Sequence, residues 1–230
     1  MRASRPKGRL HVPLRSAKSR SHSSQLWLER QLNDPYVARA KREGLRARSA
    51  FKLAEIDDEH RFLKPGARVI DLGAAPGSWS QIAAHRVQAS AGRGRVIAID
   101  VLDMAPIPGV EFLRLDFLAE TAPDAIKSVL QGAADVVLSD MAPNTSGHRR
   151  TDHLKIMGLA EAAAEFAAEV LAPGGTFLCK VLQGGTETSL LTLLKRDFMR
   201  VKHVKPPASR ADSAELYLLA MGFRAGPQRR

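Results

Sequence analysis

The sequence has little or none of several features that define classes of function. Its 230 residues include a single cysteine, Cys179, which excludes an internal disulfide and a thiolate metal cluster. No apolar run approaches the roughly 18 residues needed to span a bilayer, and the N-terminus lacks the apolar segment of a secretory signal. We therefore expect a reducing, cytoplasmic location with no membrane attachment and no bound metal.

Positive charge is abundant but confined to one end of the chain. The formal net charge is +11, and residues 1–52 hold fourteen Lys and Arg against three acidic residues. The rest of the chain is neutral overall. A phosphate backbone is the partner that such a pole favours, through counterion release and electrostatic steering. A solubilising tail or a membrane-surface segment is the alternative, but the stretch lacks the apolar face of an interfacial helix.

The basic residues expected to contact nucleic acid lie in the helical part of this segment: Arg39, Lys41, Arg42, Arg46 and Arg48. Aromatic residues make up only 5% of the chain, so base stacking should contribute little to the grip on nucleic acid. Binding through these cations should instead weaken strongly as salt is added.

The chain divides into an extension and one domain. Residues 1–24 are rich in Arg, Lys and Ser without a hydrophobic period, which predicts a basic, disordered N-terminal extension. Residues 25–225 form the predicted domain. Within it, 25–60 are expected to form basic helices and 67–222 an α/β core.

Short apolar runs bounded by turn residues predict seven strands: Arg68–Leu72, Arg95–Asp100, Val110–Leu115, Asp135–Ser139, Thr176–Leu182, Arg200–Lys205 and Ala214–Met221. Helical spacing and helix-start signals predict the helices: from Pro35 to Gly44, around Ala50–Asp57, and near 78–87, 153–171 and 189–197. Strands that alternate with helices indicate a doubly wound α/β fold, a parallel sheet covered on both faces. The last two strands are joined without a helix, which predicts an antiparallel edge.

A glycine-containing loop follows the first strand, at residues 71–79 (DLGAAPGSW). Ligands of doubly wound sheets bind at such a position, and Gly73 and Gly77 would let a ligand approach the backbone. The spacing is GxxxG rather than GxGxxG, and the lysine of a P-loop is absent. An acid before the loop therefore favours a nucleoside over a pyrophosphate, which disfavours a nicotinamide dehydrogenase.

Acidic residues end three of the predicted strands. Asp100 could accept the hydroxyls of a ribose, Asp116 could meet an adenine amino group, and Asp140 closes the fourth strand. Three carboxylates at neighbouring strand ends suit a cationic ligand such as a sulfonium. The alternative for each one alone is a helix cap or a turn former.

Two charged residues interrupt strands that are otherwise apolar. Lys180 follows Cys179 and points to the opposite face of its strand, and Glu215 lies in the last strand. A buried lysine is costly without a partner, so Lys180 should reach the functional edge of the sheet. A snorkelling lysine and an exposed edge glutamate are the alternatives, and Lys52 considered alone is more often a surface residue.

Five motifs together resemble the RrmJ/FtsJ (RlmE) family of ribosomal RNA 2′-O-ribose methyltransferases. They are RARSAFKL (46–53), VIDLGAAPGSWSQ (69–81), SDMAPNTSG (139–147), KVLQG (180–184) and SRADSAELYLLA (209–220). The resemblance covers about residues 33–222. The sequence departs from the family pattern at Ser78, where the family often has glycine, and in the long basic N-terminal extension.

The resemblance implies a Rossmann-like S-adenosylmethionine-dependent methyltransferase fold with a mostly parallel, seven-stranded sheet and an antiparallel last strand. It implies S-adenosylmethionine as the methyl donor, a uridine ribose of large-subunit (23S) ribosomal RNA as the acceptor, and the large ribosomal subunit as the partner. Because no exposed apolar seam in the sequence demands a dimer, we expect a monomer. The implied catalytic group is Lys52, Asp140, Lys180 and Glu215. The implied cofactor-binding residues are Gly73, Gly77, Trp79, Asp100, Asp116 and Asp140.

Other reactions fit the residues less well. Methylation of pyrimidine carbon 5 usually needs a cysteine nucleophile, and Cys179 faces away from Lys180. Methylation of an exocyclic amine generally uses a [DN]PP[YF] loop, where this chain has DMAP. Two alternatives stay open: a 2′-O-methyltransferase of another RNA, such as tRNA, and a non-catalytic RNA-binding module that would leave Asp100 and Asp116 without a purpose.

Overall fold

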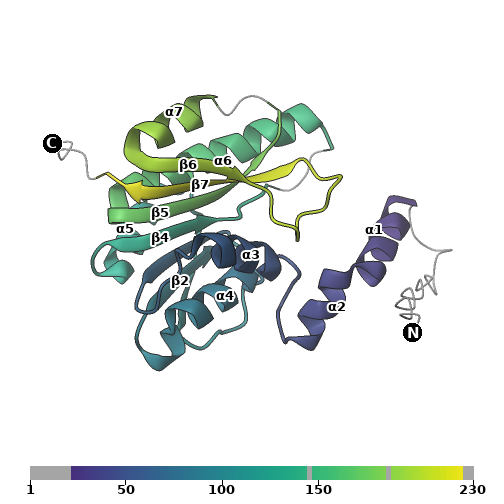
Figure 1. Cartoon of the computed structure of the whole chain (residues 1–230), viewed down its shortest axis with the longest axis horizontal. Helices are drawn as coiled ribbons and strands as arrows, with labels where there is room; N and C mark the ends of the chain where they lie inside the picture. Colours follow the sequence, from purple (N-terminus) through teal and green to yellow (C-terminus); the bar gives the residue numbers. More distant parts are fainter. Residues whose placement is uncertain (1–21, 144–146, 185–187, 225–230) are drawn as a thin grey trace, which may run out of the picture.

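A seven-stranded sheet forms the centre of the computed structural model, which describes residues 22–143, 147–184 and 188–224 (Figure 1). The strands are β1 (Arg68–Leu72), β2 (Arg95–Asp100), β3 (Val110–Arg114), β4 (Ala134–Ser139), β5 (Leu171–Leu182), β6 (Phe198–Val204) and β7 (Glu215–Phe223). Their order is β3-β2-β1-β4-β5-β7-β6. The pairs among β1 to β5 are parallel, and β7 is antiparallel to both β5 and β6. The predicted sheet is confirmed.

Helices cover both faces of this sheet. They are α1 (His22–Asn33), α2 (Pro35–Arg42), α3 (Ala50–His60), α4 (Ser78–Val87), α5 (Ala122–Leu130), α6 (Arg149–Val170) and α7 (Thr188–Asp197), with a 3-10 turn at Ala89–Ala91. Buried residues of α3 and α4 pack in a cluster on one face, and those of α5, α6 and α7 pack in a larger cluster on the other. The doubly wound arrangement therefore matches the prediction.

The central strands are hydrophobic on both sides because helices cover both sides. In β1, Ile70 and Leu72 join the cluster beneath α5 and α6, whereas Val69 joins the cluster beneath α3 and α4. All three are 0% exposed. Alternation with a period of two sends each residue to its face, and an unbroken apolar run is what two covered faces require.

The structure differs from the sequence prediction at three places. Helix α5 was not predicted, although Ala122, Ile126 and Leu130 are spaced by four and all buried. Strand β5 begins before the Pro-Gly-Gly turn that was expected to precede it, and its pairing with β4 shifts register there. Helix α1 begins at His22, inside the segment predicted as an extension, and residues 1–21 lie outside the described part of the chain.

The packing of the core predicts that substitution of two leucines by alanine has different effects on the free energy of unfolding. Leu138, on β4, is 0% exposed, whereas Leu118 is 61% exposed. Leu138→Ala should lower the free energy of unfolding by about 2–5 kcal/mol, because it removes apolar contacts and leaves a cavity. Leu118→Ala should change it by less than about 0.5 kcal/mol. Urea unfolding measures both, and equal effects would contradict the described packing.

Candidate functional site

The loop Gly73–Gly77 leaves β1 where the strand order reverses between β1 and β4. Both glycines have positive φ, 75° and 101°. A Cβ on Gly73 would lie 2.7 Å from Met141 Cγ, and one on Gly77 would lie 2.6 Å from Arg46 Nη1. Larger residues at these two positions would displace the loop, which leads directly into the first turn of α4. An open α/β sheet binds its ligand at this point.

Two of the predicted cofactor carboxylates border this loop or the neighbouring strand end. Asp100 accepts hydrogen bonds from the backbone N–H groups of Ala75, at 2.9 Å, and Leu102, at 2.8 Å. Asp116 is exposed and accepts one from Leu118 N at 3.0 Å. Both aspartates therefore also stabilise turns, which was the alternative role expected for a single aspartate at a strand end. A carboxylate oxygen has more than one lone pair, so both can still accept a ligand hydroxyl or amine.

Trp79 lies in the first turn of α4, with its side chain turned into the core. The indole is 2% exposed, stacks at 5.6 Å against the ring of Tyr217, and donates from Nε1 to Ser49 O at 3.0 Å. The side chain thus ties α4 to the start of α3. The part of Trp79 that can meet a ligand is its backbone, at the helix N-terminus.

Asp71 is a buried acid of this site that the sequence prediction named only as the residue before the loop. Its Oδ2 accepts a hydrogen bond from Ser80 Oγ at 2.6 Å, and its Oδ1 is buried without a hydrogen-bond partner among the described residues. Burial raises the pKa of Asp71 to about 7; the Ser80 hydrogen bond opposes this shift, and the charges of Asp140 and Asp100 add to it.

The raised pKa predicts a specific effect of pH on stability. An unfolded aspartate titrates near about 4, so the folded state holds this proton more tightly and the free energy of unfolding falls between about pH 4 and pH 7. Asp71→Asn removes the titration. Its stability relative to the unsubstituted protein should be higher at pH 8 than at pH 5, by roughly 1–3 kcal/mol.

Urea unfolding at the two pH values tests this expectation. Asp124→Asn, at an exposed position of α5, is the matched control and should show no such change. If Asp71→Asn shows the same difference from the unsubstituted protein at both pH values, Asp71 does not hold a proton in the folded state.

The four residues expected to be catalytic come together as two ion pairs near the carboxyl ends of β4 and β5. Lys180 Nζ, on β5, lies 3.1 Å from Asp140 Oδ1 and donates to the Asp140 backbone oxygen at 2.7 Å. Lys52 Nζ, on α3, lies 2.7 Å from each of the Glu215 carboxylate oxygens. The four side chains are between 10% and 19% exposed. They are therefore partly buried, and the surface alternatives for these residues do not hold.

Tyr217 joins the two pairs and was not among the predicted site residues. It is 0% exposed, its hydroxyl donates to Asp140 Oδ1 at 3.2 Å, and its ring lies 5.9 Å from Lys52 Nζ. Burial, together with the charges of Asp140 and Glu215, raises the pKa of Tyr217 well above its ordinary value. The hydroxyl thus stays a donor. Strand alternation could have found it, because it follows Glu215 by two residues and so shares its face.

Glu215 is kept ionised by its neighbours. Burial alone would raise its pKa, but the charge and hydrogen bond of Lys52, helped by a hydrogen bond from Ser209 and the charge of Lys180, hold the pKa of Glu215 below its usual value. Ser209 Oγ donates to Glu215 Oε1 at 2.9 Å. Ser209 belongs to the motif at 209–220 but was not singled out from the sequence.

Three of the residues expected to contact nucleic acid are exposed on α2. Arg39, Lys41 and Arg42 all lie in its last turn. Arg39 pairs with Glu43 at 2.7 Å and lies 4.4 Å over the ring of Phe51. Lys41 and Arg42 are the more available cations of this helix, because no ion pair or hydrogen bond of their side chains occurs in the described structure.

The other two are held by the protein itself. Arg46 donates to Pro76 O at 2.8 Å and to Pro106 O at 2.9 Å, so it bridges the glycine loop and the segment after β2. Arg48 pairs with Asp34 at 2.9 Å, donates to Ala208 O at 2.6 Å, and is 16% exposed. The charge pattern alone could not separate these structural arginines from exposed ones.

Within residues 22–143, 147–184 and 188–224, no group of three or more His, Cys, Asp or Glu residues is arranged to hold a metal ion. No helix in these ranges is long and apolar enough to cross a membrane.

The sequence pattern of FtsJ-like methyltransferases matches residues 45–223. The chain belongs to the FtsJ-like methyltransferase family. It is 64% identical over 219 residues to proteins named ribosomal RNA large subunit methyltransferase E from Nitrobacter winogradskyi and Afipia carboxidovorans, covering 95% of this chain and 95% and 97% of theirs. A crystal structure described as a ribosomal RNA methyltransferase of Plasmodium falciparum is similar with a TM-score of 0.69 and 31% identity, over 77% of this chain and 98% of that one.

This membership confirms the prediction that the protein is a methyltransferase with a Rossmann-like sheet and an antiparallel strand β7. The dehydrogenase and the non-catalytic RNA-binding module are thereby set aside. The matched range begins just before Lys52 and ends at the last residue of β7, so it spans all four residues of the two ion pairs.

Proposed function

We propose that this protein transfers the methyl group of S-adenosylmethionine to the 2′-hydroxyl of a uridine ribose in 23S ribosomal RNA. We further propose that it acts in the cytoplasm, on the large ribosomal subunit. The names of its relatives support ribosomal RNA over tRNA as the substrate. Lys52, Asp140, Lys180 and Glu215 all come from one chain, which supports action as a monomer.

The observation that carries the proposal is the placement of the Lys180–Asp140 pair beside the glycine loop. Asp140 N donates to Leu72 O at 3.2 Å, so the acid lies next to the strand end from which the loop departs. A partly buried lysine is thereby held a short distance from where a nucleoside cofactor would bind. Methyl transfer to a hydroxyl needs such a group, because a ribose hydroxyl is a weak nucleophile and one proton must be removed.

The residues of the loop region fit S-adenosylmethionine. When bound, it supplies a methyl group on a positively charged sulfur that an incoming oxygen displaces in line. Asp100 offers carboxylate oxygens for the ribose hydroxyls, and Asp116 offers one for an amino group. The glycines let the ligand approach the backbone of the loop. The negative charges of Asp100 and Asp140 at this edge suit a cation.

Each residue of the catalytic group has a role that follows from its contacts. Asp140 holds Lys180 with a carboxylate and a backbone oxygen, so the ammonium or amine group is fixed in one direction. We assign to Lys180 the removal or the orientation of the 2′-hydroxyl proton. Lys52 and Glu215 are assigned to the ribose and phosphate of the acceptor, since Lys52 carries a positive charge and Glu215 is ionised.

Substitution of Lys180 tests the assignment. Lys180→Ala should reduce methyl transfer by at least about 100-fold, because general base catalysis contributes roughly that factor or more. The measurement uses methyl-labelled S-adenosylmethionine and large ribosomal subunits that lack modification, followed by digestion of the RNA to nucleosides. Label should appear in 2′-O-methyluridine with the unsubstituted protein.

Lys180→Arg separates the two roles of the lysine. The guanidinium stays protonated, so it can orient a hydroxyl but cannot accept its proton. Near-complete loss of methyl transfer in both variants supports Lys180 as a general base. Retention of methyl transfer in Lys180→Arg supports a role in orienting the hydroxyl. Binding of S-adenosylmethionine, measured by calorimetry, should be unchanged in both. Label on a nucleobase of the RNA, or full methyl-transfer activity of Lys180→Ala, would contradict the proposed reaction.

The basic residues of α2 give a second prediction about the RNA. Lys41→Ala combined with Arg42→Ala should weaken RNA binding by about tenfold, and less so as salt rises, because two exposed cations are removed. Arg48→Ala should instead lower the free energy of unfolding by about 1–3 kcal/mol, since it removes one charged partner of the buried Asp34 carboxylate, which keeps Arg210 and the Tyr36 N–H. Filter binding and urea unfolding distinguish the two effects. An equal drop in RNA affinity in a stably folded Arg48→Ala would be contrary to this assignment.

A further inference from the structure

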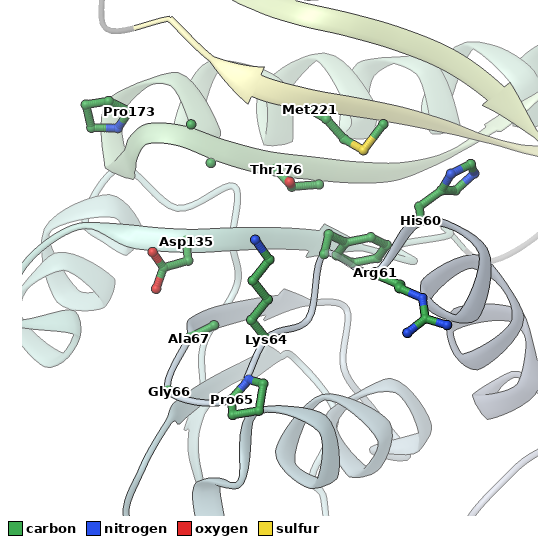
Figure 2. A pocket seen from close by; sticks show the side chains of 13 residues that line it. His60, Arg61, Lys64, Pro65, Gly66, Ala67, Asp135, Pro173, Thr176 and Met221 are labelled. Carbon is green, nitrogen blue, oxygen red and sulfur yellow. The ribbon is translucent and has the colours of Figure 1, made fainter.

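A cavity lies at the amino ends of β1 and β4, at the opposite end of the strands from Lys180 (Figure 2). Its volume is about 510 Å³, within the range of sites that hold a small molecule or one nucleotide. It is lined by the end of α3, the segment that precedes β1, and residues of β4, β5 and β7. These are residues 60–62, 64–67, 135, 173–176 and 221. None of these residues belongs to the site described above.

The charges around this cavity are mainly positive. Figure 2 shows the Lys64 side chain extending across the face of β4, with Arg61 and His60 at one side. Neither Lys64 nor Arg61 has an acidic partner among the described residues. Asp135 is the one acid of the lining, and its Oδ2 already accepts a hydrogen bond from Arg68 N at 2.8 Å. Glu59 lies outside the lining, and its carboxylate is 3.6 Å from His60 Nε2.

A row of cations continues from this cavity along the edge strand β6. Arg200 pairs with Met221, which lines the cavity, and Lys202 pairs with Leu219. The pairing from Arg200 to Val204 is continuous, so Arg200 and Lys202 share one face with Val204, the face that carries α3 and α4 elsewhere. No helix lies in front of β6 and β7 on that side in Figure 1. Both cations are exposed and unpaired in the described part of the chain.

The same strand pair leads to the catalytic group. Val204, at the other end of this row, pairs with Tyr217, whose hydroxyl contacts Asp140. Tyr217 and Met221 are four positions apart in β7, which is about 13 Å along a strand. The exposed face of β6 therefore connects the catalytic edge with the cavity by a short path that carries only positive charge.

We propose that the RNA strand next to the methylated nucleotide runs along β6 over Arg200 and Lys202, and that one of its nucleotides enters the cavity, where Lys64 binds its phosphate. This inference rests on the proposed function and names a binding surface for that substrate. It assigns the specificity of the enzyme in part to RNA that lies outside the catalytic group. Free mononucleotides share the chemistry of this ligand, so the test includes one.

The test measures RNA affinity and methyl transfer for two full-length variants, Arg200→Ala with Lys202→Ala, and Lys64→Ala. The probes are a single-stranded RNA that ends at the target uridine and RNAs extended to its 5′ or its 3′ side. With one of the extended RNAs, the double variant should bind about tenfold more weakly. The slope of log affinity against log salt should be shallower by roughly 0.7 for each phosphate that is no longer neutralised. Binding of the unextended RNA, and turnover at saturating RNA, should stay as in the unsubstituted protein.

The matched control is Lys127→Ala with Lys195→Ala, which removes the same charge from exposed positions of α5 and α7, on the other face of the sheet. An equal decrease of affinity in this control would show a long-range charge effect and overturn the inference. So would variants that bind extended RNA normally while the unsubstituted protein methylates it. Failure of the unsubstituted protein to methylate any of the RNAs, despite binding S-adenosylmethionine, would instead overturn the proposed function. Competition by uridine 5′-monophosphate that is abolished in Lys64→Ala, with unchanged binding of extended RNA, would make the cavity a mononucleotide site and contradict the strand path.

Discussion

The antiparallel insertion of β7 between β5 and β6 is the constraint on which the proposed catalytic group, Lys52, Asp140, Lys180 and Glu215, depends. Glu215 is the first residue of β7, and only an antiparallel β7 brings its first residue to the edge where β4 and β5 end. Within that pair Lys180 lies opposite Tyr217. A register shift of one residue would turn Tyr217 and Glu215 to the other face, so Asp140 would lose the Tyr217 hydroxyl and Lys52 would lose Glu215. The partly buried charges are acceptable because this register pairs them.

The segment between β6 and β7 is held by contacts that begin far away in the chain. Glu55 accepts a hydrogen bond from Ala208 N at 2.6 Å, and Arg48 donates to Ala208 O. Lys205 holds the same segment by donating to Ser213 O at 2.8 Å. Ser209, fixed in this way, reaches Glu215. The basic N-terminal part of the chain thus stabilises the segment that holds the proposed catalytic residue Glu215. Arg48, one of its cations, contacts the protein itself and is therefore less available to RNA.

The sequence predicted the elements whose signals are local. The glycine loop, the acids at strand ends and Lys180 in an apolar strand each follow from a few neighbouring residues, and the structure places them at one edge of the sheet. Arg46 and Arg48 could not be assigned from the sequence, because their partners, Pro106 and Ala208 among them, are distant in the chain. Tyr217 was missed for a different reason. Strand alternation places it on the same face as Glu215, but a buried tyrosine in a strand is ordinarily a core residue, and the hydrogen bond of its hydroxyl to Asp140 is seen only in the structure.

The same topology accounts for the face of β6 that carries cations. Two parallel neighbours need a crossover connection, which usually contains a helix that covers one face of the sheet, whereas an antiparallel pair can be joined directly. Because β6 and β7 are antiparallel, no crossover helix is placed over them on the side of α3 and α4, and α7 packs on the other side. Residues on the uncovered face must be compatible with water, and Arg200 and Lys202 meet this requirement. The strand reversal that brings Glu215 to Lys52 therefore also leaves a charged surface that begins beside the proposed catalytic group.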